Sequence, residues 1–511
     1  MNSQPYSVTR IRRALVHFAG GRVVQASARA ILLIVLVRLL PVEDYGAYML
    51  LVGLSEMMLI MTSFGIVPVG RRYIPEMSTK LPAEKLKRFI VTLTLLQAVS
   101  LCLVTLGILY GWTALAPWMG FSPEQVTTTR QALWLFLLVP AFRFTAEMLE
   151  ALMEQGRAQI ARALMPTGRV VGIGSLLLLG VQVELPVIII VDIVITAFCL
   201  LLAYSMLRKS LRDLPAPEST ENIPVREMMR FGWHMAAVNL LGTTSQPGAI
   251  RLVLANSLGI VESGLFAFLQ SLQRLVGRYL PGTLLRGIIR PVLVSRAFKP
   301  GGMHIVEAGA GLLFKSNLLI VGAGSVVIAV GGDALVSWLS GGKFPQAGLT
   351  LLLIFLSLAI TAQRNVIDMV MQIVGHTAAL RAISVIGPLT LLAVWLFAHM
   401  GLNVAVLIIA FGTALSNWIA MSVLVRSATG FNVDWRGLAA IVIPAGTVIV
   451  LGMLMATRLS WFMAAGIVLV LFAFSLWLSK PVNTRELSLV ERVAGGKAAG
   501  LMGVFANRKN A

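Results

Sequence analysis

Membrane-length apolar segments recur along the whole of this 511-residue chain, and they constrain its fold more than any other feature. A helix that crosses a bilayer needs about 20 mostly apolar residues, and the chain holds about fourteen such segments. They lie near residues 15–40, 46–70, 89–111, 131–153, 163–182, 186–207, 229–256, 260–281, 309–331, 347–373, 380–400, 402–425, 437–456 and 460–479. Because backbone groups inside lipid must be hydrogen-bonded internally, each segment is expected to be a helix. The sequence therefore predicts an all-α, polytopic membrane protein.

Basic residues in the connections predict the topology. Lys and Arg number 42 against 22 Asp and Glu, and they concentrate in every second connection, whereas the others hold few, such as Lys343 and Arg458. The positive-inside rule then places both termini in the cytoplasm. The net charge is +20, but the sequence shows no basic segment interleaved with aromatic residues. Nucleic acid is therefore not an expected partner.

The chain reads as a duplication followed by an extra pair of helices. Proline and charged residues between Arg208 and Arg230 indicate a linker. We predict an N-terminal six-helix lobe at 1–213, a cytoplasmic linker at 214–228, a C-terminal six-helix lobe at 229–430, and two further helices with a cytoplasmic tail at 431–511. A shift of about 218 residues aligns 45–48 with 263–266, and a similar shift aligns 156–162 with 375–381. Parallel repeats of this kind place a substrate cavity between the lobes.

Charged residues inside the predicted helices indicate where a substrate passes, because a cation within the bilayer normally faces a wet cavity. In the first helix, Arg22, Gln25 and Arg29 share one face at helical spacing. Arg38 lies nearer the outer surface, within reach of the membrane boundary. Glu56 in the second helix has two interpretations: a structural ion pair with Arg29, or a counter-charge or proton carrier beside a cavity-facing Arg29.

Two further helices carry an arginine four residues before an acid. In the fourth, Arg143 and Glu147 begin a charged stripe that continues through Glu150 and Glu154. In the tenth, Arg364 and Asp368 have the same spacing. An intrahelical ion pair and a role in the cavity both satisfy this spacing, so both interpretations stay open.

The seventh and eighth helices supply more polar positions. Asn239, Thr243 and Gln246 form a stripe that ends at a kink expected at Pro247, before Arg251. Arg274 and Arg278 share a face of the eighth helix, where they line the cavity or reach the inner surface. Arg169 and Lys315 lie near the inner ends of their helices, and we expect them to snorkel. Asp192 receives no role.

The candidate site combines these positions. Arginine presents a rigid donor fork that suits phosphate or pyrophosphate. The candidate substrate-binding residues are Arg22, Arg29, Arg38, Arg143, Arg251, Arg274, Arg278 and Arg364, and the candidate coupling or counter-charge residues are Glu56, Glu147 and Asp368. The two cysteines form no metal-ligand spacing, so neither a metal nor another cofactor is expected.

Short motifs near the start of the chain resemble those of a known transporter group. Residues 40–48 (Leu-Pro-Val-Glu-Asp-Tyr-Gly-Ala-Tyr), 64–66 (Phe-Gly-Ile) and 71–76 (Arg-Arg-Tyr-Ile-Pro-Glu) are similar to the opening of bacterial polysaccharide flippases, in the multidrug/oligosaccharidyl-lipid/polysaccharide (MOP) exporter superfamily. The resemblance implies a V-shaped pair of six-helix lobes in the bacterial inner membrane. It also implies alternating access, a polyprenyl-diphosphate-linked oligosaccharide as substrate, and polysaccharide polymerase and assembly proteins as partners.

Two other functions compete with the flippase. A multidrug or toxin exporter of the same fold would bind cations at acidic residues, yet the predicted first helix has arginines and no acid. A membrane glycosyltransferase, polymerase or ligase would need catalytic groups on sizeable external loops, and the predicted loops are short. No phosphate-binding loop for nucleotides is present, so coupling to a proton or sodium gradient or to the membrane potential is expected.

Overall fold

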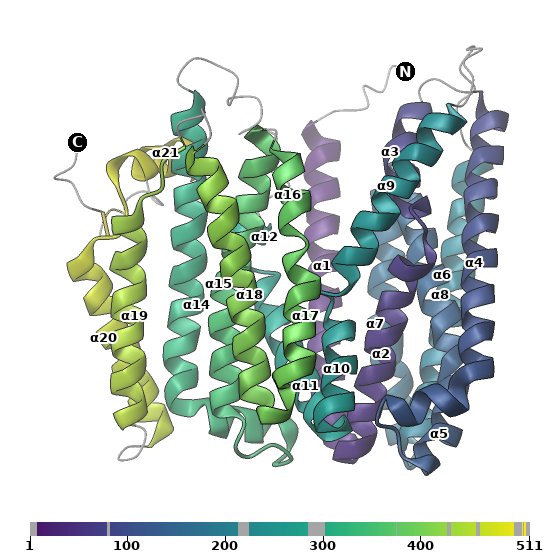
Figure 1. The fold of residues 1–511 in the computed structure, drawn as a ribbon, viewed down its shortest axis with the longest axis horizontal. Helices are drawn as coiled ribbons and strands as arrows, with labels where there is room; N and C mark the ends of the chain where they lie inside the picture. The colour runs from purple at the N-terminus through teal and green to yellow at the C-terminus, as the bar shows by residue number, and fades with distance from the viewer. Residues whose placement is uncertain are drawn as a thin grey trace. The chain divides into compact units, whose positions relative to one another are not determined.

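The protein is described by a computed structural model that covers residues 8–78, 82–212, 224–284, 302–374, 376–426, 431–455 and 460–494, together with 503, 505 and 506. Within these residues the chain forms helices joined by short connections (Figure 1), and the one β-type contact found there is a bridge between Val482 and Ala506. The prediction of an all-α polytopic protein is confirmed. Gly375 and residues 214–223 of the predicted linker lie outside the described residues.

The chain divides into two compact units, Met1–Phe268 and Leu269–Ala511, with the boundary inside one helix. The first unit contains α1 (Val8–Leu39), α2 (Val42–Thr62), α3 (Ile66–Met77), α4 (Ala83–Trp118), α5 (Pro123–Thr129), the short 3₁₀ helix η1 (Arg130–Ala132), α6 (Leu133–Ala151), α7 (Gln155–Leu178), α8 (Leu185–Arg212), α9 (Val225–Thr243), α10 (Pro247–Leu258) and the start of α11 (Ile260–Gly277).

The second unit continues from the end of α11. It contains α12 (Pro281–Leu284), α14 (Gly302–Ser340), α15 (Gly348–Val374), α16 (Thr377–Ile383), α17 (Ile386–Phe397), η2 (Ala398–Met400), α18 (Leu402–Arg426), α19 (Trp435–Met455), α20 (Trp461–Ser479) and α21 (Thr484–Ala494).

Each predicted segment overlies helical structure, and ten helices or helical runs in the described chain are long and apolar enough to cross a membrane. Some of the predicted segments are broken, among them the second, the seventh and the eleventh, which is divided between α16 and α17. The second ends at Thr62 and resumes as α3, because Phe64 and Gly65 take positive φ values of 39° and 83°. The seventh breaks before Pro247, which becomes the first residue of α10. Proline tolerates this position because it has no backbone N–H to donate to the preceding turn.

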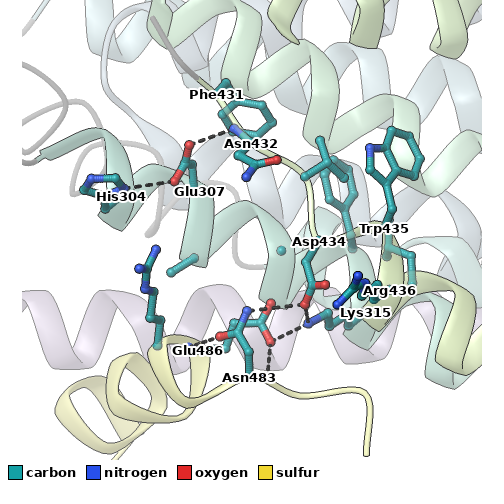
Figure 2. A pocket seen from close by; sticks show the side chains of 16 residues that line it. His304, Glu307, Lys315, Phe431, Asn432, Asp434, Trp435, Arg436, Asn483 and Glu486 are labelled. Carbon is teal, nitrogen blue, oxygen red and sulfur yellow. Dashed lines mark hydrogen bonds and ion pairs between the residues drawn. The ribbon is translucent and has the colours of Figure 1, made fainter. Parts of the chain in front are cut away.

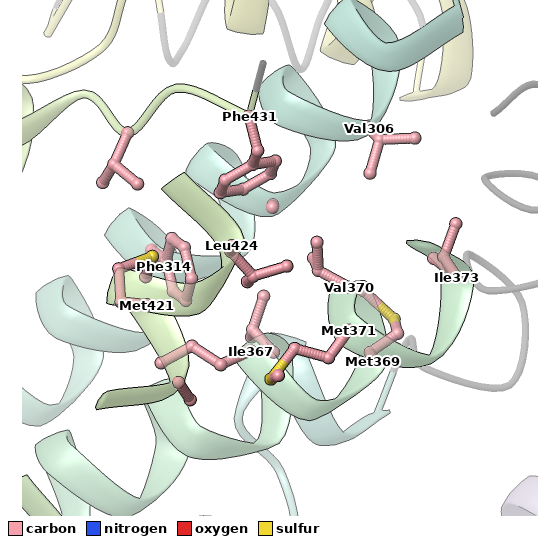
Figure 3. Packing of buried hydrophobic residues seen from close by; sticks show 14 of the residues in the cluster. Val306, Phe314, Ile367, Met369, Val370, Met371, Ile373, Met421, Leu424 and Phe431 are labelled. Carbon is pink, nitrogen blue, oxygen red and sulfur yellow. The ribbon is translucent and has the colours of Figure 1, made fainter. Parts of the chain in front are cut away.

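The core of the second unit is a set of aliphatic, methionine and phenylalanine side chains (Figure 3). Phe314 of α14, Val370 and Met371 of α15, and Leu424 of α18 are all buried in it. Lipid tails are as apolar as these side chains, so within a bilayer the helices are held by close packing more than by exclusion of water.

Small residues let α2 pack very closely against α10 and α11 inside the first unit. A Cβ added at Gly264 would lie 2.7 Å from the Cα of Gly46, and one added at Gly248 would lie 2.4 Å from the carbonyl oxygen of Gly53. Larger side chains would force the helices apart. Gly46 and Gly264 are the two positions that the sequence alignment of the repeats placed in register. We call these two contacts the glycine seam.

Candidate substrate path in the first unit

The charged residues predicted on one face of α6 form ion pairs with neighbouring helices. Arg143 Nη2 lies 2.6 Å from Glu56 Oε1 of α2. Glu147 bridges two arginines, at 2.6 Å from Arg71 Nε of α3 and 3.3 Å from Arg162 Nη2 of α7. Glu150 pairs with the other end of the same Arg162 guanidinium. We call these six residues, Glu56, Arg71, Arg143, Glu147, Glu150 and Arg162, the charged stripe.

The helices that carry the stripe are positioned by further contacts. Gln25 of α1 donates to the carbonyl oxygen of Arg162 at 3.0 Å, which fixes α1 beside α7. Arg157, one turn before Arg162, pairs with Glu154 at 3.1 Å and donates to Ser210 Oγ of α8 at 2.7 Å. Polar side chains of α1, α2, α3, α6, α7 and α8 therefore make contacts between these helices.

The stripe is partly open. The side chains of Arg143 and Glu56 are 38% and 33% exposed, and those of Arg162 and Glu150 are 30% and 31% exposed. Charged groups on membrane helices are strongly disfavoured in contact with lipid tails, and they normally face a water-filled path. The exposure of the Arg143–Glu56 and Arg162–Glu150 pairs is therefore consistent with a water-filled path along α6.

The stripe holds as many carboxylates as guanidinium groups. Each arginine also carries five N–H donors, more than one carboxylate can accept, so a paired arginine can still donate to a phosphate. A ligand that enters the stripe can thus bind arginines while the acids offset their charge.

A second charge cluster of the first unit is buried. Asp192 of α8, fully inaccessible, accepts from Tyr48 Oη at 2.7 Å and lies 3.0 Å from Arg169 Nε of α7. Arg169 also reaches Thr196 Oγ1 at 3.4 Å. The expectation that Arg169 snorkels is therefore wrong: its partner is an acid inside the bundle. The sequence signal was the isolated Asp192 in an apolar run, which needs a cation from a neighbouring helix.

The remaining candidates of the first unit differ in exposure. Arg251 of α10 is fully buried, and its Nη1 donates to the carbonyl oxygen of Met49 on α2 at 3.2 Å. Arg29 is half-buried on α1, and Arg38 near its end is exposed. The side chain of Arg22 lies outside the described residues. Their roles as substrate ligands stay predictions.

In the second unit, Arg364 Nε of α15 lies 2.7 Å from Asp368 Oδ1, and its guanidinium also donates to Ser416 of α18. The intrahelical interpretation thus describes this pair. Arg274 is half-buried and donates to Ser271 Oγ at 3.2 Å, whereas Arg278 is exposed.

The expectation for Lys315 is also wrong. Its side chain is 1% exposed, and its ammonium group is held between Asp434 and Glu486, as described below. Lys315 lies 13 residues inside α14, which begins earlier than the apolar pattern predicts. Among the described residues, no group of three or more His, Cys, Asp or Glu side chains could hold a metal ion.

Comparisons with known proteins identify the family and the fold. Residues 13–284 match the family described as polysaccharide biosynthesis protein. No curated protein sequence matches the chain. Among solved structures, the lipid II flippase MurJ in an inward closed conformation superposes with a TM-score of 0.65 at 11% identity, covering 91% of this chain and 99% of that one.

Two multidrug transporters of the MATE family share the fold more distantly. One, an inward-facing transporter of the MOP superfamily, has a TM-score of 0.52 at 14% identity and covers 80% of this chain and 93% of its own. The other, in a bent conformation, has a TM-score of 0.50 at 17% identity, with coverage of 81% and 95%. The chain shares the fold of this flippase and of these transporters, and it belongs to the polysaccharide biosynthesis protein family.

Proposed function

We propose that this protein flips a polyprenyl-diphosphate-linked oligosaccharide, the repeat unit of an O-antigen, capsule or exopolysaccharide, from the cytoplasmic to the outer leaflet of the bacterial inner membrane. Both termini lie in the cytoplasm. Polysaccharide polymerase and assembly proteins then take the product. The repeat boundaries stay as the sequence predicts them, with lobes at 1–213 and 229–430 and an extra helix pair after residue 431.

The observation that carries this proposal is the charged stripe in a chain of the polysaccharide biosynthesis protein family. A substrate with a diphosphate and a neutral or acidic glycan is large, polar and anionic. Such a molecule needs arginine donors and water along its path rather than a narrow apolar pocket. Partly exposed Arg143 and Arg162 meet the first need, and their acidic partners keep them from holding the diphosphate too tightly.

In alternating access, a transport path that is closed toward one face of the membrane must open toward that face. The glycine seam is a close contact of α2 with α10 and α11, and Arg251 is buried beside it with a backbone carbonyl as acceptor. In this proposal the seam closes one side of the path, and its parting exposes Arg251 to the substrate. Helices that contact each other through glycines can move apart easily, because no side chains interdigitate between them.

Coupling follows from the same groups. Glu56, Glu147 and Asp368 each pair with an arginine. A proton or sodium ion that displaces such a pair would change the charge of the path and so link transport to an ion gradient. The alternative function, a cation-coupled multidrug or toxin exporter, is favoured by the MATE fold and by the acids of the stripe.

Mass spectrometry of polyprenyl-linked lipids separates the two functions. Cells that lack this gene, with the later polymerisation and ligation steps intact, are expected to accumulate a polyprenyl-diphosphate oligosaccharide, whose mass identifies the glycan. An unchanged lipid pool together with increased drug sensitivity would favour the exporter. Re-expression of the gene provides the control.

Arg29 offers a test at the level of one side chain. Because Arg29 is half-buried on the polar face of α1, Arg29→Ala is expected to abolish flipping while membrane insertion is retained, measured by lipid accumulation and by protein level in the membrane. Full activity of this variant would give Arg29 a structural role instead.

A further inference from the structure

A pocket of about 440 Å³ lies where α14, α19 and α21 meet in the second unit (Figure 2). Its walls come from the first turns of α14, from residues 431–438 ahead of and within α19, and from residues 483–486 at the start of α21. Nothing in the proposed transport path uses it. Its position at the first residue of a membrane-length helix, α19, places it at a boundary between membrane and water.

The floor of the pocket is a buried charge cluster, which we call the lysine triad. Lys315 Nζ lies 2.6 Å from Asp434 Oδ2 and 2.7 Å from Glu486 Oε2. The side chains of Lys315 and Glu486 are each 1% exposed. Gly311 on α14 allows this approach, because a Cβ there would lie 2.6 Å from Glu486 Oε1. The shape of the pocket is therefore fixed by α21 held against α14.

The acids of the pocket are already engaged. Glu307 accepts the N–H of Asn432 at 2.7 Å and lies 3.1 Å from His304 Nδ1. Asp434 accepts the N–H of Gly437 at 2.9 Å besides its bond from Lys315. Figure 2 draws the contacts of Glu307 with Asn432 and His304, and that of Lys315 with Asp434, as dashed lines. With its carboxylates bound to protein donors, the pocket is poorly suited to a metal ion or an organic cation.

Two arginines of the pocket, unlike its acids, are not bound by other described protein groups. Arg436 and Arg485 both line it and are exposed, and within the described part of the chain neither side chain makes an ion pair or hydrogen bond. The guanidinium fork fits two oxygens of a phosphate at once. Trp435, which precedes Arg436 in the lining, is 60% exposed, as is typical of aromatic residues at a membrane boundary.

We propose that this pocket binds the phosphate of an anionic membrane lipid, with Arg436 and Arg485 as donors and the lysine triad as its rigid floor. Basic pockets between transmembrane helices at the cytoplasmic side suit such head groups. The site is separate from the glycan path, and it does not depend on the proposed function. A lipid bound there would join α21 to α14 and α19 and hold the end of the second unit in the membrane surface.

The test uses the full-length protein in a neutral detergent. Short-chain phosphatidylglycerol is the probe, and its binding is measured by native mass spectrometry. The site variant combines Arg436→Gln and Arg485→Gln. The matched control combines Arg381→Gln and Arg426→Gln, which removes two exposed arginines from the same unit. Thermal unfolding of both variants checks that the fold is retained, which is expected because all four side chains are exposed.

We expect binding to weaken about tenfold for each pocket arginine removed, since each gives up hydrogen bonds to a charged group, and to stay unchanged in the control. Phosphatidylcholine should bind at least about tenfold more weakly, because its head group has no net charge to attract the arginines. Equal loss in the control, or no binding to the wild type, would overturn the site. Displacement by an equal concentration of inorganic phosphate would mean that a soluble anion, and not a lipid, is the ligand. The assay contains no glycan, so its result is independent of the transport proposal.

Discussion

The charged stripe of the first unit and the lysine triad of the second both pair cationic side chains with carboxylates, yet the central pair of each differs in exposure. Arg143 and Glu56 of the stripe are about a third exposed, whereas Lys315 and Glu486 of the triad are 1% exposed. A buried charge that loses its partner is costly, while a partly hydrated one can turn to water. We therefore predict that exposure, and not the number of ion pairs, distinguishes charged groups that bind a substrate from charged groups that stabilise the fold.

The largest expected effect follows from removing Lys315. Lys315→Ala leaves Glu486 buried without a cation, and breaking a buried pair costs about 3–5 kcal/mol of unfolding free energy. SDS-induced unfolding in mixed micelles measures it. Lys87→Ala is the control, because Lys87 and Glu84 are exposed and 3.9 Å apart, so about 0–1 kcal/mol is expected. Equal effects of the two variants would break the comparison.

A substitution of Asp192 tests whether removing a buried charge also destabilises the first unit. Asp192→Asn removes the charge beside Arg169 and keeps the size of the side chain, so a loss of about 3 kcal/mol is expected. The same unfolding measurement applies, with Tyr48→Phe as a partner variant that removes only the hydrogen bond, at about 1 kcal/mol. A loss smaller for Asp192→Asn than for Tyr48→Phe would mean that the pair is hydrated and belongs with the stripe.

The sequence predicts which residues share a helix face, but not which neighbouring helix supplies a partner. Helical spacing places Arg143 and Glu147 together, and the structure pairs each of them with another helix instead, through Glu56 and Arg71. The Arg364–Asp368 pair, with the same spacing, does form within one helix. The same spacing of arginine and acid thus forms ion pairs between helices in α6 and within the helix in α15. Tertiary packing decides which of the two pairings forms.

Helix positions are more predictable than helix ends. Apolar length located every predicted span, since lipid imposes about 20 residues on each. It missed that α14 begins at Gly302, well before its apolar run, and so it placed Lys315 at a helix end. Asp434 and Glu486 lie 119 and 171 residues away in sequence, and no local pattern identifies partners at such distances.

The two acids of the lysine triad, which lie outside the membrane-spanning segments, should respond to pH in opposite directions. Burial by itself would raise the pKa of Asp434, but hydrogen bonds from Lys315, Gly437 and Asn483 bring it below its ordinary 3.8. Its stabilising contribution is present above that value and is lost as pH falls through the lower native pKa. Burial raises the pKa of Glu486 above its ordinary 4.5, more than Lys315 lowers it. Its protonated form therefore favours folding below pH 4.5, and this contribution is lost as pH rises through the native pKa.

Single variants separate these two titrations. The difference in unfolding free energy between wild type and Asp434→Asn should shrink below pH 3.8. For Glu486→Gln, the difference should change above pH 4.5, with the wild type losing stability as pH rises. Parallel pH profiles for the two variants would mean that the triad titrates as one group.

The smallest expected change in stability belongs to the charged stripe, where the loss of function should be large. Arg143→Gln removes a pair that is about a third exposed, so the unfolding free energy should fall by about 1 kcal/mol or less. Flipping should nevertheless fail, because a donor on the path is gone, and polyprenyl-linked glycan should accumulate as in the gene deletion. Glu56→Gln is the companion variant: it leaves Arg143 in place without its acid, so a substrate diphosphate should bind more tightly and leave more slowly. If Arg143→Gln instead lost as much stability as Lys315→Ala and kept its activity, the stripe would be part of the scaffold, and exposure would no longer distinguish the two regions.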